Sequence, residues 1–186
     1  MKRLADLLAA LVGLALFMPL WLVLAFLIRL DSSGPVLFRQ VRVGRNGQEF
    51  VLLKFRSMRT ETPNLSTAEL RATRLEPYTG LGKWLRRTSL DELPQLWNVL
   101  RGEMSLVGPR PALPSQTALN LGRKKNGIDA LRPGITGWAQ INGRDDLTDE
   151  EKLSRDTEYL IRQSLFLDGS IIGRTIATIF TGKGNK

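Results

Sequence analysis

The stretch LLAALVGLALFMPLWLVLAFLI, from Leu7 to Ile28, decides the fold class of this chain. It is an uncharged, apolar run of 22 residues, long enough for a helix to cross a hydrocarbon core about 30 Å thick. A secretory signal is disfavoured, because the run exceeds an h-region and Arg29 stands where a small-residue cleavage site would be. A buried soluble helix that is apolar on all sides is unusual in a small domain. We therefore expect a membrane-embedded helix.

Two features bear on how this helix sits in the membrane. Pro19 lies near the middle of the run, where it removes a backbone hydrogen bond and kinks a helix. A spanning helix usually has one basic flank, whereas here both flanks are basic. The basic residues are Lys2 and Arg3 before the run, and Arg29, Arg39, Arg42 and Arg45 after it. From the residues alone, a re-entrant helix and a spanning helix with a tolerated proline remain equally open.

Composition narrows the chemistry of the remaining residues. The chain has neither cysteine nor histidine, which excludes disulfides, thiolate zinc sites, cysteine nucleophiles and histidine bases. Any metal would be held by oxygen ligands, which favours Mg²⁺, Ca²⁺ or Mn²⁺. The net charge of +9 indicates an anionic partner: nucleic acid, an anionic membrane surface or a phosphorylated small molecule.

The polar part of the chain alternates short strand and helix patterns. Residues 36–54 alternate apolar and polar side chains around Asn46-Gly47, which predicts a β-hairpin with a type I′ turn. Residues 61–78 read as a loop that holds a short helix around Ser66–Arg74. Residues 82–102 predict two short helices, or one broken helix, that end at Gly102.

The last third contains a glycine-rich stretch and two helix patterns. Residues 131–144 lack a helical period and are interpreted as a structured loop. Residues 147–163 predict a helix with Thr148 as its N-cap and acids in its first turn. Residues 164–180 predict an amphipathic helix, which would lie at a membrane interface or pack on the core.

Asp91 and Glu92 stand side by side at the head of an apolar, helix-like run. Ser89 and Glu92 have the spacing of a capping box, with Ser89 as N-cap. In a second interpretation Pro94 is the first helical residue, and both carboxylates lie in the turn before it. Either way the acids sit near a helix N-terminus, which favours negative charge.

The charges around this pair favour a chemical role. Cations that crowd a carboxylate lower its pKa and keep it ionised, so an aspartate here could attack phosphorus. Arginine forks suit phosphate oxygens, and a carboxylate pair with Mg²⁺ could orient a diphosphate. The nearby cations are Lys83, Arg86, Arg87, Arg101 and Arg110.

Four blocks resemble, in order, the signature segments of the bacterial sugar transferase family, the monotopic phosphoglycosyl transferases. They are KRLADLLAA (2–10), KFRSM (54–58), RRTSLDELPQLWNVLRGEMSLVGPRP (86–111) and RPGITGWAQINGR (132–144). The resemblance extends over nearly the whole chain. It implies transfer of a sugar 1-phosphate from a UDP-sugar to polyprenol (undecaprenyl) phosphate with release of UMP, the first membrane step of glycoconjugate biosynthesis.

The resemblance also implies roles for single residues. Asp91 would attack the β-phosphate and form a covalent phosphosugar intermediate, while Glu92 would position Mg²⁺ or take a proton. Asp91 and Glu92 would be the metal ligands. The other implied contacts are to the substrates: Lys54, Arg86 and Arg110 at the phosphates, and Arg132, Gln140 and Arg144 near the nucleotide.

For the fold, the resemblance implies a mainly helical α+β protein at the cytoplasmic face of the bacterial inner membrane, in contact with membrane lipids. Residues 1–30 would form the re-entrant helix and residues 31–186 the interfacial catalytic domain. The family breaks its membrane helix at Ser-Pro, whereas this chain has Met18-Pro19, so the kink would rest on Pro19. Interfacial helices can pair, so the sequence leaves a homodimer open.

Other functions compete with this one. Another membrane-bound phosphotransferase or phosphatase could use the same aspartyl-phosphate chemistry. A membrane-anchored nucleic-acid-binding protein fits the charge, but no nucleic-acid motif is present and the arginines lie dispersed among Gly/Pro segments. A non-catalytic membrane scaffold would have no need of Asp91.

Overall fold

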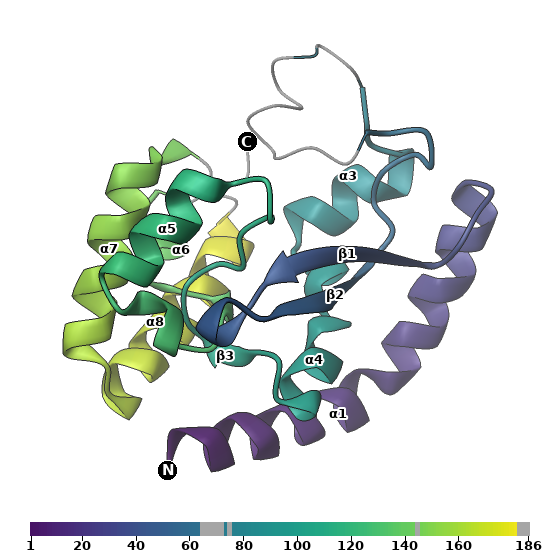
Figure 1. The fold of residues 1–186 in the computed structure, drawn as a ribbon. Coiled ribbons are helices and arrows are strands. Elements are labelled where there is room, and N and C mark those ends of the chain that lie inside the picture. Colours follow the sequence, from purple (N-terminus) through teal and green to yellow (C-terminus); the bar gives the residue numbers. More distant parts are fainter. Residues whose placement is uncertain (64–72, 74–75, 144–145, 182–186) are drawn as a thin grey trace.

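Helix α1 (Lys2–Asp31) curves along one side of the protein, and the other elements lie within its concave face (Figure 1). The computed structural model describes residues 1–63, 73, 76–143 and 146–181. Pro19 lies inside α1, and the helix continues without a break on both sides of it. The predicted long apolar helix is therefore confirmed, and it curves as one element through Pro19.

The N-terminal end of α1 is tied to the domain by polar contacts. Lys2 Nζ lies 2.6 Å from Asp168 Oδ2, and Arg3 donates to the carbonyl oxygen of Val99 at 2.7 Å. The buried carboxylate of Asp6 accepts hydrogen bonds from Ser105 Oγ at 2.8 Å and from a backbone N–H at 3.1 Å.

The C-terminal end of α1 is held in the same way. Arg56 donates to the carbonyl oxygens of Ile28 and Ser32 at 3.3 and 2.6 Å, where a cation complements the helix dipole. Asp31 accepts the backbone N–H of Leu81 at 3.3 Å. Both ends of the apolar helix are therefore bound to one and the same domain.

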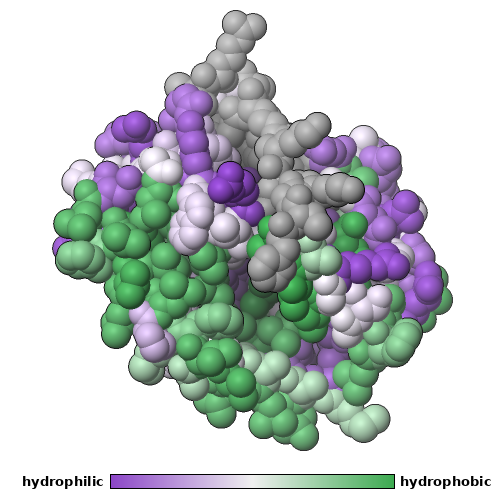
Figure 2. Space-filling model, turned by 180° about the vertical axis from the view of Figure 1, so that it is seen from behind, coloured by the Kyte–Doolittle hydropathy of each residue, from purple (hydrophilic) through white to green (hydrophobic). Residues whose placement is uncertain are grey.

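The outer face of α1 presents apolar side chains to the surroundings. Within α1 only Asp6, Ala10, Leu24 and Ile28 are buried. Figure 2 shows a broad apolar surface on the far side of the molecule. Burying such a surface in lipid is favourable in proportion to its area, whereas exposing it to water is not. The exposed apolar residues of α1 include Leu4, Leu8, Leu11, Val12, Leu16, Met18, Leu22, Val23 and Phe26.

Strands β1 (Leu37–Val43) and β2 (Glu49–Phe55) form the predicted antiparallel hairpin. Asn46 and Gly47 both have positive φ, as the predicted turn requires, and the N–H of Gln48 donates to the carbonyl of Arg45. The other edge of β2 is covered by a side chain. Asn98, fully buried, accepts from the Leu53 N–H at 3.1 Å and donates to the Val51 carbonyl at 2.7 Å.

The prediction of short helices over residues 82–102 is confirmed. The elements are α3 (Gly80–Arg87), the 3₁₀ turn η2 (Leu90–Glu92) and α4 (Gln95–Arg101). Gly102 ends α4 with φ of 85°, a left-handed conformation that glycine adopts without steric cost.

The interpretation of residues 131–144 as a structured loop is wrong. Strand β4 (Gly134–Thr136) pairs in parallel with β3 (Ser105–Val107), and the one-turn helix α6 (Trp138–Ile141) follows. These elements are too short to show a period in the sequence. Gly134 is required there, because a Cβ would lie 2.1 Å from the backbone nitrogen of Gly108.

The remaining helices complete a mainly helical α+β fold. They are α5 (Thr117–Lys125), the 3₁₀ turn η3 (Ile128–Ala130), α7 (Asp149–Arg162) and α8 (Leu165–Thr181). Thr148 is the N-cap of α7, as predicted, and it also forms a full capping box with Glu151. Helix α8 both packs on the core through Ile171 and exposes Phe166. The helix predicted around Ser66–Arg74 lies outside the described residues.

Candidate active site

Asp91 and Glu92 lie in the 3₁₀ turn η2, between α3 and α4. Ser89 makes no side-chain capping bond, and its φ of 56° takes it out of N-cap geometry, so the capping-box prediction is wrong. The alternative prediction is off by one residue. Pro94 is the N-cap of α4 and has helical backbone angles, and the carboxylates occupy the preceding turn as predicted.

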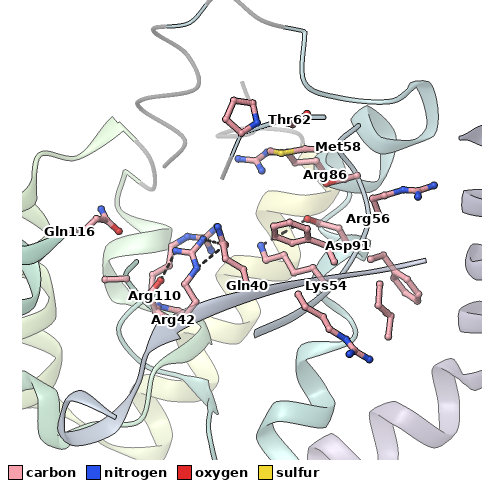
Figure 3. Close-up of a pocket in the computed structure, with 18 of the residues that line it drawn as sticks. Gln40, Arg42, Lys54, Arg56, Met58, Thr62, Arg86, Asp91, Arg110 and Gln116 are labelled. Atoms are coloured by element: carbon pink, nitrogen blue, oxygen red, sulfur yellow. Dashed lines mark hydrogen bonds and ion pairs between the residues drawn. The ribbon is translucent and has the colours of Figure 1, made fainter. Parts of the chain in front are cut away.

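Lys54 brings strand β2 to the two carboxylates. Its Nζ lies 2.7 Å from Glu92 Oε1 and 4.0 Å from Asp91 Oδ2. Arg110, in the Pro-Arg-Pro segment, reaches the same Glu92 oxygen at 3.4 Å. Two segments that are far apart in sequence therefore deliver cations to the Asp91–Glu92 pair. Figure 3 shows Lys54 beside Asp91.

Burial raises the pKa of Asp91, a residue that is only 3 % exposed. The cations Lys54, Arg86 and Arg110 act in the opposite direction, and the neighbouring Glu92 adds to the increase. The expectation that surrounding cations would lower this pKa is therefore wrong, because the loss of hydration outweighs them. A carboxylate that water solvates poorly is a more reactive base and nucleophile once it is ionised.

A cavity of about 1090 Å³ opens onto Asp91. Figure 3 shows its walls, with Asp91 and Lys54 near the centre, Arg42 and Arg110 to one side and Arg86 above. Arg86 also stacks on the ring of Tyr78, 5.3 Å from its centroid. The predicted residues that line this cavity are Lys54, Arg86, Asp91, Arg110 and Gln140.

The three residues predicted from the third block have different placements. Gln140 lies in the cavity wall and donates to the Ile135 carbonyl at 2.8 Å. Arg132 does not line the cavity. It donates to the Gly102 carbonyl at 2.9 Å, next to the start of α1. Arg144 lies outside the described residues.

The sequence reading missed several cavity residues. Arg42 lines the cavity, donates to the Pro111 carbonyl at 3.0 Å and contacts Gln40 beside it. The alternation of the predicted hairpin could have found them, because residues 40 and 42 share one face of a strand.

Arg123 also lines the cavity, and it was not predicted. It binds the buried Asp156 at 2.7 Å and donates to the carbonyl of Arg110 at 2.8 Å. The buried ion pair therefore fixes the segment that carries Arg110. No pattern in the sequence pairs residue 123 with residue 156.

Comparison with known proteins agrees with the family resemblance of the four sequence blocks. The sequence profile described as "Bacterial sugar transferase" matches residues 1–182. The undecaprenyl-phosphate glucose phosphotransferase of Komagataeibacter xylinus is 47% identical over 94% of this chain. The uncharacterized sugar transferase EpsL of Bacillus subtilis is 41% identical over 99% of it. The UDP-glucose:undecaprenyl-phosphate glucose-1-phosphate transferase of Escherichia coli is 40% identical over 100% of it.

These relatives differ in length. This chain spans 89% of EpsL, but only 35% of the Komagataeibacter protein and 41% of the Escherichia coli protein. The matched part is in every case nearly the whole of this chain. From this coverage and the family profile, the chain belongs to the bacterial sugar transferase family.

Proposed function

We propose that this chain transfers a sugar 1-phosphate from a UDP-sugar to polyprenol (undecaprenyl) phosphate, with UMP as the leaving group. The observation that carries the proposal is a buried aspartate, Asp91, with three cations around it at the wall of a large cavity. Two of the relatives bear the names of undecaprenyl-phosphate sugar phosphotransferases, which supports the same class of substrate.

In the first step, a carboxylate oxygen of Asp91 attacks the β-phosphorus of the UDP-sugar. A bond forms between that oxygen and phosphorus, and the bond from phosphorus to the UMP oxygen breaks. UMP leaves with the electron pair. Lys54, Arg86 and Arg110 would stabilise the charge that develops on the phosphate oxygens, and their field is strong because the site is partly removed from water.

In the second step, an oxygen of polyprenol phosphate attacks the same phosphorus and Asp91 leaves as a carboxylate. The product is a polyprenol diphosphate sugar. Glu92 is held by Lys54 at 2.7 Å and Arg110 at 3.4 Å, which favours an orienting role for its carboxylate over a role as proton acceptor. Covalent capture of the sugar phosphate lets the two substrates use one site in turn.

We propose that magnesium binds this site together with substrate. Among the described residues there is no group of three side chains suited to hold a metal. Mg²⁺ usually takes one or two carboxylates plus substrate phosphates, and the adjacent Asp91 and Glu92 can supply the carboxylates. When bound, the ion would neutralise diphosphate charge that otherwise repels the attacking carboxylate.

We further propose that α1 is re-entrant and the protein monotopic, with its domain on the cytoplasmic face where nucleotide sugars are available. A straight helix of 30 residues is about 45 Å long, which exceeds the hydrocarbon thickness. A spanning helix would carry its two ends to opposite sides, yet Lys2 and Asp31 both bind the same domain. One soluble domain cannot reach both membrane faces without crossing the bilayer.

The proposed function is tested by incubating the purified protein with labelled UDP-sugars, polyprenol phosphate and Mg²⁺. Label that moves into the lipid fraction together with stoichiometric UMP supports the transferase. Release of free phosphate without labelled lipid would identify a phosphatase and contradict the proposal.

A further inference from the structure

One face of strand β1 changes from apolar to basic along the cavity. Alternate residues of a strand share a face, so Phe38, Gln40 and Arg42 point to the same side, with about 7 Å between successive side chains. All three line the cavity. Along the strand, this face therefore presents an aromatic ring, an amide and a guanidinium group in order, over roughly 13 Å.

Phe38 lies at the apolar end of this series and close to the reacting group. It pairs directly with Lys54 across the hairpin, and such partners have Cβ atoms about 5 Å apart. Lys54 Nζ in turn lies 4.0 Å from Asp91. Phe38 is 37 % exposed and belongs to none of the core clusters found among the described residues. Core packing therefore gives no reason for an aromatic ring at this position.

The apolar end of the cavity continues onto the membrane helix. Val36 and Leu37 line the cavity and also pack on the cluster that contains Leu24 and Ile28 of α1. Pro35 and Met58 also line the cavity. Apolar side chains therefore extend from α1 to the cavity wall, beside Arg39 and Arg56, which also line the cavity.

The opposite end of the cavity is polar and basic. Arg42 and Arg110 lie on this side, and Gln116, the residue directly before α5, lies beyond them (Figure 3). Arg123 and Lys152 complete the basic wall. In the figure, Asp91 lies between this end and Arg56, which binds the end of α1.

We propose that the two substrates of the proposed reaction extend from Asp91 to opposite ends of the cavity. The first isoprenoid units of the acceptor lie against Val36 and Phe38, and the nucleotide of the UDP-sugar lies along Arg42 and Gln116. The inference rests on the proposed function. In each step the new bond to phosphorus forms on the side opposite to the bond that breaks. The acceptor phosphate therefore attacks from the position that the UMP phosphate has left. The isoprenoid chain and the uridine are the parts of the two substrates that lie in different places.

The two half-reactions of a covalent mechanism separate the two ends. UMP release without acceptor reports on the nucleotide end, and transfer to polyprenol phosphate reports on the lipid end. We expect Phe38→Ser to raise the KM for polyprenol phosphate about tenfold, since an apolar contact of ring size is lost. The rate of UMP release and the KM for the UDP-sugar should stay within about twofold. Arg42→Gln should show the reverse pattern.

Val41→Ser is the matched control. Val41 is apolar and 43 % exposed, but it lies on the opposite face of β1 and does not line the cavity. It should leave both half-reactions unchanged, and Phe38→Leu should restore most of the acceptor affinity. The inference is overturned if Phe38→Ser slows UMP release or impairs both substrates equally. Wild-type protein that forms no labelled lipid would instead overturn the proposed function, and the inference with it.

Discussion

Lys54 and Glu92 form an ion pair of 2.7 Å in which both side chains are largely buried. The same ammonium lies 4.0 Å from Asp91, so one cation from strand β2 serves both carboxylates of η2. Burying a carboxylate charge is unfavourable, and the Lys54 ammonium in this position offsets part of that cost. It also remains close to the phosphate that Asp91 would attack in the proposed reaction.

Lys54→Met should lower kcat/KM by roughly 10²–10³, the range seen when one preorganised donor to a transition state is removed. The measurement is transfer of labelled sugar phosphate to polyprenol phosphate. Lys83→Met is the matched control, because Lys83 pairs with Glu76 at the exposed surface and does not line the cavity. A change of less than threefold in Lys54→Met would remove Lys54 from the mechanism.

The raised pKa of Asp91 predicts a displaced acid limb in the pH profile of UMP release. The attacking form is the carboxylate, so the rate should fall with decreasing pH at a higher pH than for an exposed aspartate. Lys54 is the largest influence that lowers this pKa, so Lys54→Met should move the limb further upward. The account is contradicted if the rate of UMP release falls in the pH range of an ordinary exposed aspartate, or if Lys54→Met moves this fall to lower pH.

The raised pKa of Asp91 also affects the stability of the folded protein, in a direction that can be predicted. A group whose pKa is raised by folding favours the folded state in its protonated form, and this contribution is lost as the pH rises through the raised pKa. At neutral pH, a buried carboxylate therefore costs stability. Asp91→Asn should unfold at a temperature at least as high as the wild type, although we expect it to be inactive. A clearly lower Tm would show that Asp91 mainly stabilises the fold.

Asn98→Ala should destabilise the domain by ~3 kcal/mol, because it leaves a buried N–H and a buried C=O on the edge of β2 without partners. Thermal unfolding in detergent measures the loss. Asn126→Ala is the matched control, since the Asn126 side chain donates to the Gly122 carbonyl at an exposed helix end. Equal effects in the two variants would mean that the edge of β2 is satisfied in some other way.

The re-entrant topology predicts that both ends of α1 are accessible from one side of the membrane. The chain has no cysteine, so single cysteines can be placed cleanly, one before Met1 and one at the exposed Ser33. In sealed inside-out vesicles, an impermeant thiol reagent should label both. Labelling of one position only, with the other reached after the vesicles are opened, would show a spanning helix.

Local chemistry explains which parts of the fold could be predicted from the sequence. The apolar run gives α1, Asn46-Gly47 gives the hairpin turn, and Thr148 with Glu151 gives the start of α7. Each of these signals lies within a few residues of the structure it specifies. The parallel pair of β3 and β4 has strands of three residues, which carry no period, and their pairing depends on contacts between distant segments.

The candidate site could likewise be predicted only in part from the sequence. Asp91, Lys54 and Arg110 were found because they stand in recognisable blocks, but their distances depend on how β2 and η2 meet. Burial, which reverses the expected pKa shift of Asp91, is a tertiary property and cannot be read from neighbouring charges in the sequence. The pairing of Arg123 with Asp156 likewise appears only when α5 packs on α7.

The central claim is that Asp91 carries the sugar phosphate, and trapping that intermediate tests it most directly. The protein is incubated with a UDP-sugar and Mg²⁺ but no acceptor, quenched, digested and analysed by mass spectrometry. We predict one sugar phosphate on the peptide that contains Asp91, with stoichiometric UMP, and no adduct in Asp91→Asn. Full transfer to lipid with no adduct in the wild type, or an adduct on another residue, would contradict the account.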